Sequence, residues 1–333
     1  MNYLTEFTYR IVFEGREHYR VMNQNNEILP AKIAGKLRQN EDLWPTVGDW
    51  VQGIPQPGDW VLITDVAPRS SLLQRKEPGS PKTQVLAANV DILFVVTSAN
   101  QDLNLNRIER YVVLATSGNI RPVILVNKIE LAEDPHQVLD RVASRFHDVD
   151  VLGVSAQEGW NLDALEDYAK PGVTVALIGS SGVGKSTLCN ALLGTNEIVT
   201  KEIREEDSRG RHATTHRQLH VTLTGAILID SPGIRQVGFT EDTDLGSGFS
   251  DLEGLALRCR FTDCQHESEP GCAIQAALLN GDLCPDRWQN YLKLAKEQAF
   301  VLRKASKALQ AEEKSKWRKI HMANRSRMKL KGR

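Results

Sequence analysis

A glycine-rich segment near the middle of the chain has the spacing of a phosphate-binding loop. Residues 179–187, GSSGVGKST, fit the pattern G-x-x-x-x-G-K-[ST] and follow an apolar run that is typical of a strand. Glycines let the backbone approach phosphate oxygens, and successive N–H groups in such a loop bind anions. We expect Lys185 to reach the β- and γ-phosphates of a nucleotide and the Ser186 hydroxyl to ligate Mg²⁺. The residues predicted to surround the phosphates are Gly179, Ser180, Ser181, Gly182, Val183, Gly184, Lys185, Ser186 and Thr187.

Two later segments have the residues of γ-phosphate sensors. The sequence DSPG, residues 230–233, stands at the end of a predicted strand. We expect Asp230 to hold Mg²⁺ through water and the Gly233 N–H to meet the γ-phosphate. The preceding segment, residues 209–216, is predicted to be a mobile switch whose hydroxyl group caps Mg²⁺. Thr214 and Thr215 are both candidates for that hydroxyl, and the sequence does not decide between them.

Hydrolysis also needs a group that orients the attacking water. Many phosphate-loop hydrolases use a Gln directly after the D-x-x-G element. This chain has Ile234 there, which offers no hydrogen-bonding group. His212 in the predicted switch can accept a hydrogen bond from water, so it joins Lys185 and the two threonines as a candidate catalytic residue.

The segment NKIE, residues 127–130, follows another apolar run and is suited to reading a guanine base. We expect Asn127 to bond the N7 side of the ring and the Lys128 stem to lie along its face. Glu130 would accept from N1–H and the exocyclic amine, which adenine cannot supply; such charge-assisted bonds contribute about 1.5–3 kcal/mol. Ser155 and Ala156 end the next predicted strand and complete this group. These elements precede the phosphate loop, so the sequence predicts a circularly permuted domain that binds GTP or GDP.

Three thiols and an imidazole lie close together further along the chain, at Cys259, Cys264, His266 and Cys272. This set matches the Cys₃His ligands of a tetrahedral, structural Zn²⁺ site with no open position for catalysis. Cys284 lies outside the cluster. We therefore predict one structural zinc ion.

The pattern of strands and helices divides the chain into three predicted domains, giving a multidomain α/β protein. Residues 1–75 show short alternating strands, which favour a β-barrel with the OB-fold as the leading candidate. Residues 76–248 alternate strands and helices, including a short helix over 161–169, and predict a mainly parallel sheet with one antiparallel strand. Residues 249–333 are predicted to be helical and contain the cysteine cluster and a basic tail.

Charge is uneven along the chain. Residues 303–333 contain 12 Lys/Arg and two acids, so the remaining 302 residues hold 41 − 12 = 29 Lys/Arg against 42 − 2 = 40 acids. A basic tail on an acidic body favours a polyanionic partner. No apolar run approaches the roughly 18 residues of a membrane span, and the first residues lack a signal-peptide pattern. We expect a cytoplasmic monomer without a membrane partner.

Taken together, these motifs resemble the ribosome small-subunit-dependent GTPase A family (RsgA, also called YjeQ) nearly end to end. The resemblance also covers residues 48–51 (GDWV), 87–91 (AANVD) and the sequences around the cysteines, DCQH and PGCAI. It departs from the usual pattern at Glu130, where the family has Asp, and at Ala213, where it has Thr.

The resemblance implies an OB-fold, a permuted GTPase domain and a zinc domain. It further implies binding to the small ribosomal subunit and its rRNA during late maturation, with GTP hydrolysis stimulated by that subunit. It also points to His212 as the catalytic histidine. Two alternatives remain at this point: an RNA-binding module with a structural nucleotide site, or a small-molecule kinase or ATPase.

Overall fold

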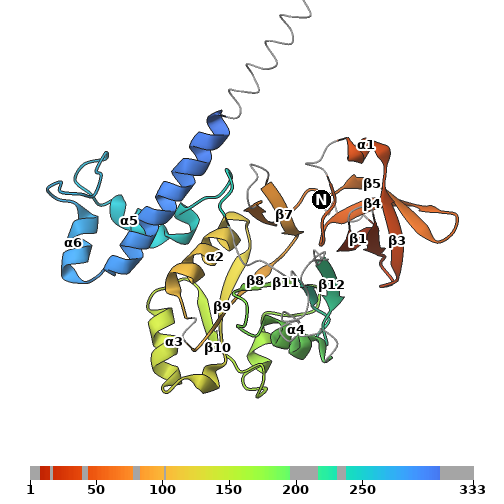
Figure 1. The fold of residues 1–333 in the computed structure, drawn as a ribbon, viewed down its shortest axis with the longest axis horizontal. Coiled ribbons are helices and arrows are strands. Elements are labelled where there is room, and N and C mark those ends of the chain that lie inside the picture. The colour runs from red at the N-terminus through yellow and green to blue at the C-terminus, as the bar shows by residue number, and fades with distance from the viewer. Residues whose placement is uncertain are drawn as a thin grey trace, which may run out of the picture.

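The computed structural model describes residues 8–15, 18–39, 44–77, 83–100, 103–195, 217–230 and 238–307. In this part of the chain, a barrel, a mainly parallel sheet with helices and a helical region follow one another from the N-terminus (Figure 1). This arrangement confirms the predicted fold class. Within the same ranges, no helix is both long and apolar enough to cross a membrane.

The N-terminal strands form a closed barrel. They are β1 (Tyr9–Glu14), β2 (Tyr19–Met22), β3 (Ile28–Ile33), β4 (Trp50–Gln56) and β5 (Trp60–Val66), with the short helix α1 (Gly35–Arg38) after β3. The order is β1-β2-β3-β5-β4, and β4 returns to pair with β1 at Tyr9↔Val51. Alternate apolar side chains, such as Ile11 and Ile63, are fully buried inside. The predicted OB-type barrel is thus confirmed.

The middle of the chain builds a sheet whose strands run parallel, with one exception. Its strands are β8 (Ile92–Ser98), β9 (Arg121–Asn127), β10 (Asp150–Gly153), β11 (Thr174–Gly179), β12 (Arg217–Val221) and β13 (Ile227–Asp230). Their order is β10-β9-β8-β11-β13-β12, and only β12 is antiparallel to its neighbour within this set. Every residue of β8 is buried, as expected for a strand covered on both faces. Its side chains alternate between two apolar cores, one on each face.

Helices cover both faces of this sheet. They are α2 (Leu105–Ser117), α3 (Pro135–Ala143) and α4 (Lys185–Leu193). The helix expected over 161–169 is wrong: a 3₁₀ turn, η4 (Asp163–Leu165), is followed by turns. Asn161 takes a left-handed φ of 57° and bonds the Gly153 carbonyl, which ties the chain back to β10. The single 3₁₀ turn that follows is too short to nucleate a stable α-helix.

Beyond the sheet, the chain becomes helical. A turn, η6 (Gly246–Gly248), leads into α5 (Ser250–Ala256) and α6 (Ala273–Asn280), and a long helix spans residues 285–307. The long helix is drawn in blue, beside α2 (Figure 1). A separate hairpin, β6 (Leu72–Lys76) with β7 (Thr83–Ala88), lies between the barrel and the sheet in sequence. A further 3₁₀ turn, η3 (Ile129–Leu131), follows β9.

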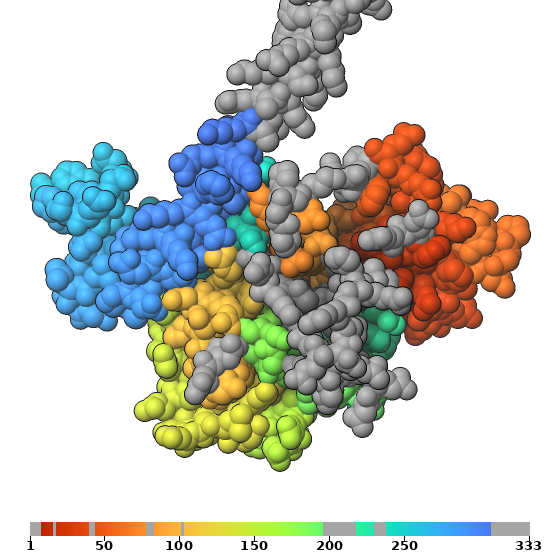
Figure 2. Space-filling model, viewed as in Figure 1, coloured from red at the N-terminus to blue at the C-terminus, as the bar shows by residue number. Residues whose placement is uncertain are grey.

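The barrel and the sheet are hydrogen-bonded into one eleven-stranded system within the described residues. Strand β1 pairs antiparallel with β12 at Phe13↔Gln218 and Glu14↔Arg217. Arg10 extends from β1 into the joint and donates to Thr174 Oγ1 over 2.7 Å. Figure 2 shows the red barrel and the blue helical part on opposite sides of the central domain.

Candidate nucleotide site and metal centre

The predicted phosphate loop connects the end of β11 to the start of α4. Gly182 and Gly184 take left-handed φ values of 82° and 92°, which side chains disfavour. At Gly184 the space is also filled, because a Cβ would lie 2.2 Å from Nδ2 of Asn127. The loop therefore has the backbone that a phosphate nest requires.

Asn127 joins this loop to two others. Its side chain is buried at the end of β9. The Nδ2 group donates to the Val183 carbonyl over 2.8 Å, and Oδ1 accepts from the Ala156 N–H over 3.0 Å. The structure thus brings together three segments that the sequence singled out separately.

Lys128 adds a second contact between the base-reading segment and the phosphate loop. It has a left-handed φ of 57°, and its Nζ donates to the Gly182 carbonyl over 2.7 Å. Glu130 lies two residues further on, within η3, and is exposed to solvent. The backbone turn at Lys128 therefore places its side chain along the loop while the carboxylate stays open.

A tight turn presents Ser155 and Ala156. The Ser155 backbone pairs with that of Trp160, and its Oγ accepts from the Glu158 N–H over 3.1 Å. These bonds hold the Ala156 N–H toward Asn127. The turn is consequently hydrogen-bonded to Asn127 at the point where the sequence predicts a contact with the base.

The cationic side chain of the loop points back into it. Lys185 Nζ donates to the Gly179 carbonyl over 2.9 Å and also to the Ser180 carbonyl. Ser186 and Thr187 follow in the first turn of α4. A positive charge is therefore held inside the ring of backbone that would surround phosphates.

One contact to this loop was not expected from the sequence. Arg107, in the first turn of α2, donates from Nη1 to the Ser180 hydroxyl. The two residues are 73 positions apart, so no local motif indicates the pair.

Several predicted site residues lie outside the described ranges. These are His212, Thr214, Thr215 and Gly233. For Asp230, the backbone is described as the last residue of β13. That strand is parallel to β11, with Ala176 opposite Ile229, so both strands end toward the same edge of the sheet.

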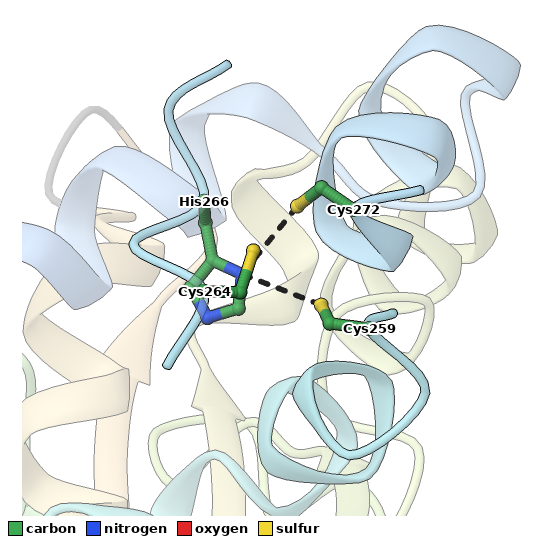
Figure 3. A group of neighbouring side chains, drawn as sticks. All are labelled: Cys259, Cys264, His266 and Cys272. Atoms are coloured by element: carbon green, nitrogen blue, oxygen red, sulfur yellow. Dashed lines mark hydrogen bonds between the residues drawn. The ribbon is translucent and has the colours of Figure 1, made fainter. Parts of the chain in front are cut away.

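The four predicted metal ligands converge. Ligand atoms of Cys259, Cys264, His266 and Cys272 all lie within 4.8 Å of one another. His266 Nδ1 is 3.5 Å from Sγ of both Cys259 and Cys272 (Figure 3). A tetrahedral zinc ion with ordinary bond lengths separates a sulfur and a nitrogen ligand by roughly 3.5 Å. The cluster therefore fits one zinc ion.

The ionisation of the thiols also suits a cation. Burial opposes ionisation of Cys259, but bonds from the Ala273 and Ile274 N–H groups bring its pKa below the ordinary value. Burial, together with the neighbouring sulfurs, raises the pKa of Cys264 to about 11. A bound metal ion would overcome that penalty, because metal-ligating thiols are deprotonated.

Surrounding contacts orient the ligands. Gln275 on α6 donates to the His266 carbonyl over 2.6 Å, and its own N–H points to Cys272 Sγ. The His266 ring packs edge-on against Trp288 of helix 285–307, with centroids 5.8 Å apart. The metal loop is thereby fastened to both α6 and the long helix.

Comparisons with known proteins agree with this geometry. The chain matches the family model of the RsgA GTPase over residues 66–240. It is 42% identical over 296 residues to the small ribosomal subunit biogenesis GTPase RsgA of Methanosarcina acetivorans, covering 88% of this chain and 80% of that protein. Small ribosomal subunit biogenesis GTPase RsgA 1 of Oceanobacillus iheyensis is 40% identical over 322 residues, or 94% and 91% of the two chains.

Two solved structures share the architecture. YjeQ from Thermotoga maritima superimposes with a TM-score of 0.67 at 25% identity, covering 88% of this chain and 98% of that one. YloQ, a circularly permuted GTPase, gives a TM-score of 0.64 at 23% identity over 90% and 97% of the two chains.

Proposed function

We propose, from the premise that this chain belongs to the RsgA GTPase family, that it assists maturation of the small ribosomal subunit by hydrolysing GTP. Relatives that cover most of its length are named small ribosomal subunit biogenesis GTPases. The proposal extends that role to this chain and adds the residues that perform it.

The observation that carries the proposal is the position of Asn127. One buried amide links the carbonyl of Val183 in the phosphate loop to the N–H of Ala156 in the third loop. A kinase or ATPase site needs no such arrangement of an Asn-Lys segment and a Ser-Ala turn around one phosphate loop. The arrangement supports a guanine nucleotide, with its phosphates on residues 179–187 and its base between Lys128 and Ala156.

Each part of the site then has a chemical role. Lys185 would bind the phosphates, and Glu130 would accept hydrogen bonds from the guanine edge. Ser186 and Asp230 would hold Mg²⁺, which neutralises phosphate charge when bound. Thr214 or Thr215 and the Gly233 N–H would report the γ-phosphate, and His212 would orient the attacking water.

The metal site has a structural role in this proposal. All four positions around a zinc ion would be filled by Cys259, Cys264, His266 and Cys272, which leaves no coordination site for a substrate. One zinc ion would stabilise the loop between α5 and α6. Catalysis would take place at the phosphate loop alone.

The remaining assignments concern the whole chain. We assign residues 1–75 to an rRNA-binding barrel, 76–248 to the permuted GTPase domain and 249–333 to the zinc domain with its basic tail. The Lys/Arg excess of the tail suits rRNA phosphates. A cytoplasmic monomer that binds the small subunit and its rRNA is the form that we propose.

Nucleotide turnover tests the assignment. The intact protein should hydrolyse GTP and not ATP, and Lys185→Ala should remove that activity. Lys170→Ala, a change to an exposed lysine outside the loop, is the matched control and should retain turnover. Hydrolysis of ATP at an equal rate, or full activity in Lys185→Ala, would contradict the proposal.

A further inference from the structure

Helix α2, which is not part of the phosphate loop, places the arginine Arg107 against that loop. The helix begins at Leu105 after its N-cap, Asn104, whose side chain accepts from the Arg107 N–H over 3.0 Å. This cap fixes the first turn of the helix. From that turn, the half-buried Arg107 guanidinium donates to the Ser180 hydroxyl.

Ser180 is consequently held from two directions. Arg107 bonds its side chain, whereas Lys185 bonds its backbone carbonyl. Lys185 is the group that we assign to the phosphates. Arg107 therefore supplies a constraint on the loop that does not depend on the lysine.

The helical domain fixes the same helix. Glu109, two residues beyond Arg107, is buried and accepts from Arg287 over 2.6 Å and from Asn290. Arg110 forms a two-bond pair with Glu297, at 2.7 and 2.6 Å. All three partners belong to the helix of residues 285–307, so α2 lies clamped between that helix and the phosphate loop.

We propose that Arg107 is a positioning residue of the nucleotide site: through the Ser180 hydroxyl it holds the loop backbone in its phosphate-binding conformation. A guanidinium is charged at every physiological pH and holds a fixed donor geometry. Because it acts on the second residue of the loop and not on the γ-phosphate, it serves GDP and GTP alike. This inference rests on the proposed function, since it requires a nucleotide in the loop.

A double-mutant cycle on nucleotide affinity tests the inference. Dissociation constants for GDP and GTP are measured for the full chain and for Arg107→Ala, Ser180→Ala and the double variant. Each single change should weaken both nucleotides about tenfold, which corresponds to ~1.4 kcal/mol. The double variant should be no weaker than either single one, because each removes the same contact.

Two further variants guard against trivial explanations. Arg107→Lys keeps a charged donor without the fixed guanidinium geometry and should recover part of the affinity, which would separate the contact from a general loss of folding. Arg121→Ala removes an arginine that pairs with Asp150 at the opposite end of the parallel strands, and should leave affinity unchanged.

The outcomes separate this inference from the proposed function. If the unaltered chain bound neither GDP nor GTP, both would fail. If the unaltered chain bound GDP and GTP, additive losses of affinity in the double variant would overturn only the inference about Arg107. Unchanged affinity in Arg107→Ala would overturn it too. A loss of affinity for GTP alone would also overturn it, because it would indicate direct contact of Arg107 with the γ-phosphate.

Discussion

Individual residues of the nucleotide site are packed so closely that an added methyl group has no room. Gly184 combines a left-handed backbone with a neighbour, Asn127 Nδ2, only 2.2 Å from the position of a Cβ. Asn127 is the side chain that links the three loops. A substituent at Gly184 would therefore push apart the segments to which we assign the base and the phosphates.

Replacing Gly184 with alanine should abolish nucleotide binding. Gly58 is a matched control, because its φ of +89° is close to the +92° of Gly184 while nothing lies within 4 Å of its Cβ position. Both substitutions introduce about 1–2 kcal/mol of backbone strain. Only Gly184→Ala should lose GDP binding in titration calorimetry. Normal binding by that variant would contradict this prediction and show that the loop and Asn127 can shift to accommodate the methyl group.

Helix α2 is the element through which the sheet contacts the long C-terminal helix of residues 285–307. The Glu109 side chain is fully buried, and Arg145 and Arg287 reach it from the turn after α3 and from helix 285–307. Asp286 and Asp251 pair with the same two arginines. A carboxylate at this point balances two cations that have little access to water.

Glu109→Ala should therefore lower the free energy of unfolding by about 3–5 kcal/mol, because the two buried arginines lose the carboxylate between them and keep only the exposed Asp286 and Asp251 as partners. Asp150→Ala removes the exposed Arg121–Asp150 pair, with side chains 63% and 44% exposed, and should cost less than about 1 kcal/mol. Urea unfolding followed by tryptophan fluorescence measures both. Similar losses of unfolding free energy in the two variants would show that the buried cluster stabilises the protein no more than the exposed ion pair does.

The loop between α5 and α6 carries the four residues that fit one zinc ion. Most of its residues between 257 and 271 are exposed, and Gln275 bonds its His266 carbonyl, so a metal ion bound by the four residues would supply much of its stability. We expect Cys264→Ser to lose most of its zinc, and Cys284→Ser, outside the cluster, to keep one equivalent.

Metal analysis of the purified proteins measures the difference. Chelation should also change the fluorescence of Trp288, which packs against His266. Equal zinc content in the two variants, or none in the unaltered protein, would rule out this site.

Across the whole molecule, the domains are joined by backbone pairing and buried charge. Strand β12, at the edge of the central sheet, is covered by β1 of the barrel. Arg10 lies within that joint, where burial lowers its pKa to about 10 despite the attraction of Asp91 and Asp49. Barrel and sheet should therefore move together when either binds a partner.

The sequence predicts best what depends on neighbouring residues. The phosphate loop, the barrel and the Cys₃His cluster could be located because their spacing is short and their chemistry is specific. The helix predicted over 161–169 was wrong, because Asn161 has a left-handed backbone and bonds the Gly153 carbonyl, a contact outside the segment. Arg107–Ser180 and Arg10–Thr174 are separated by 73 and 164 residues, and only the folded chain shows that they meet.

The most direct test of the central claim is GTP hydrolysis by the full chain with purified small ribosomal subunits, with large subunits and with neither. Small subunits should raise GTP turnover about tenfold or more, which corresponds to ~1.4 kcal/mol of barrier, whereas large subunits should leave it unchanged. ATP should not be hydrolysed faster under any of the three conditions. A GTP turnover rate that is unchanged by small subunits, or raised equally by small and large subunits, would contradict the account.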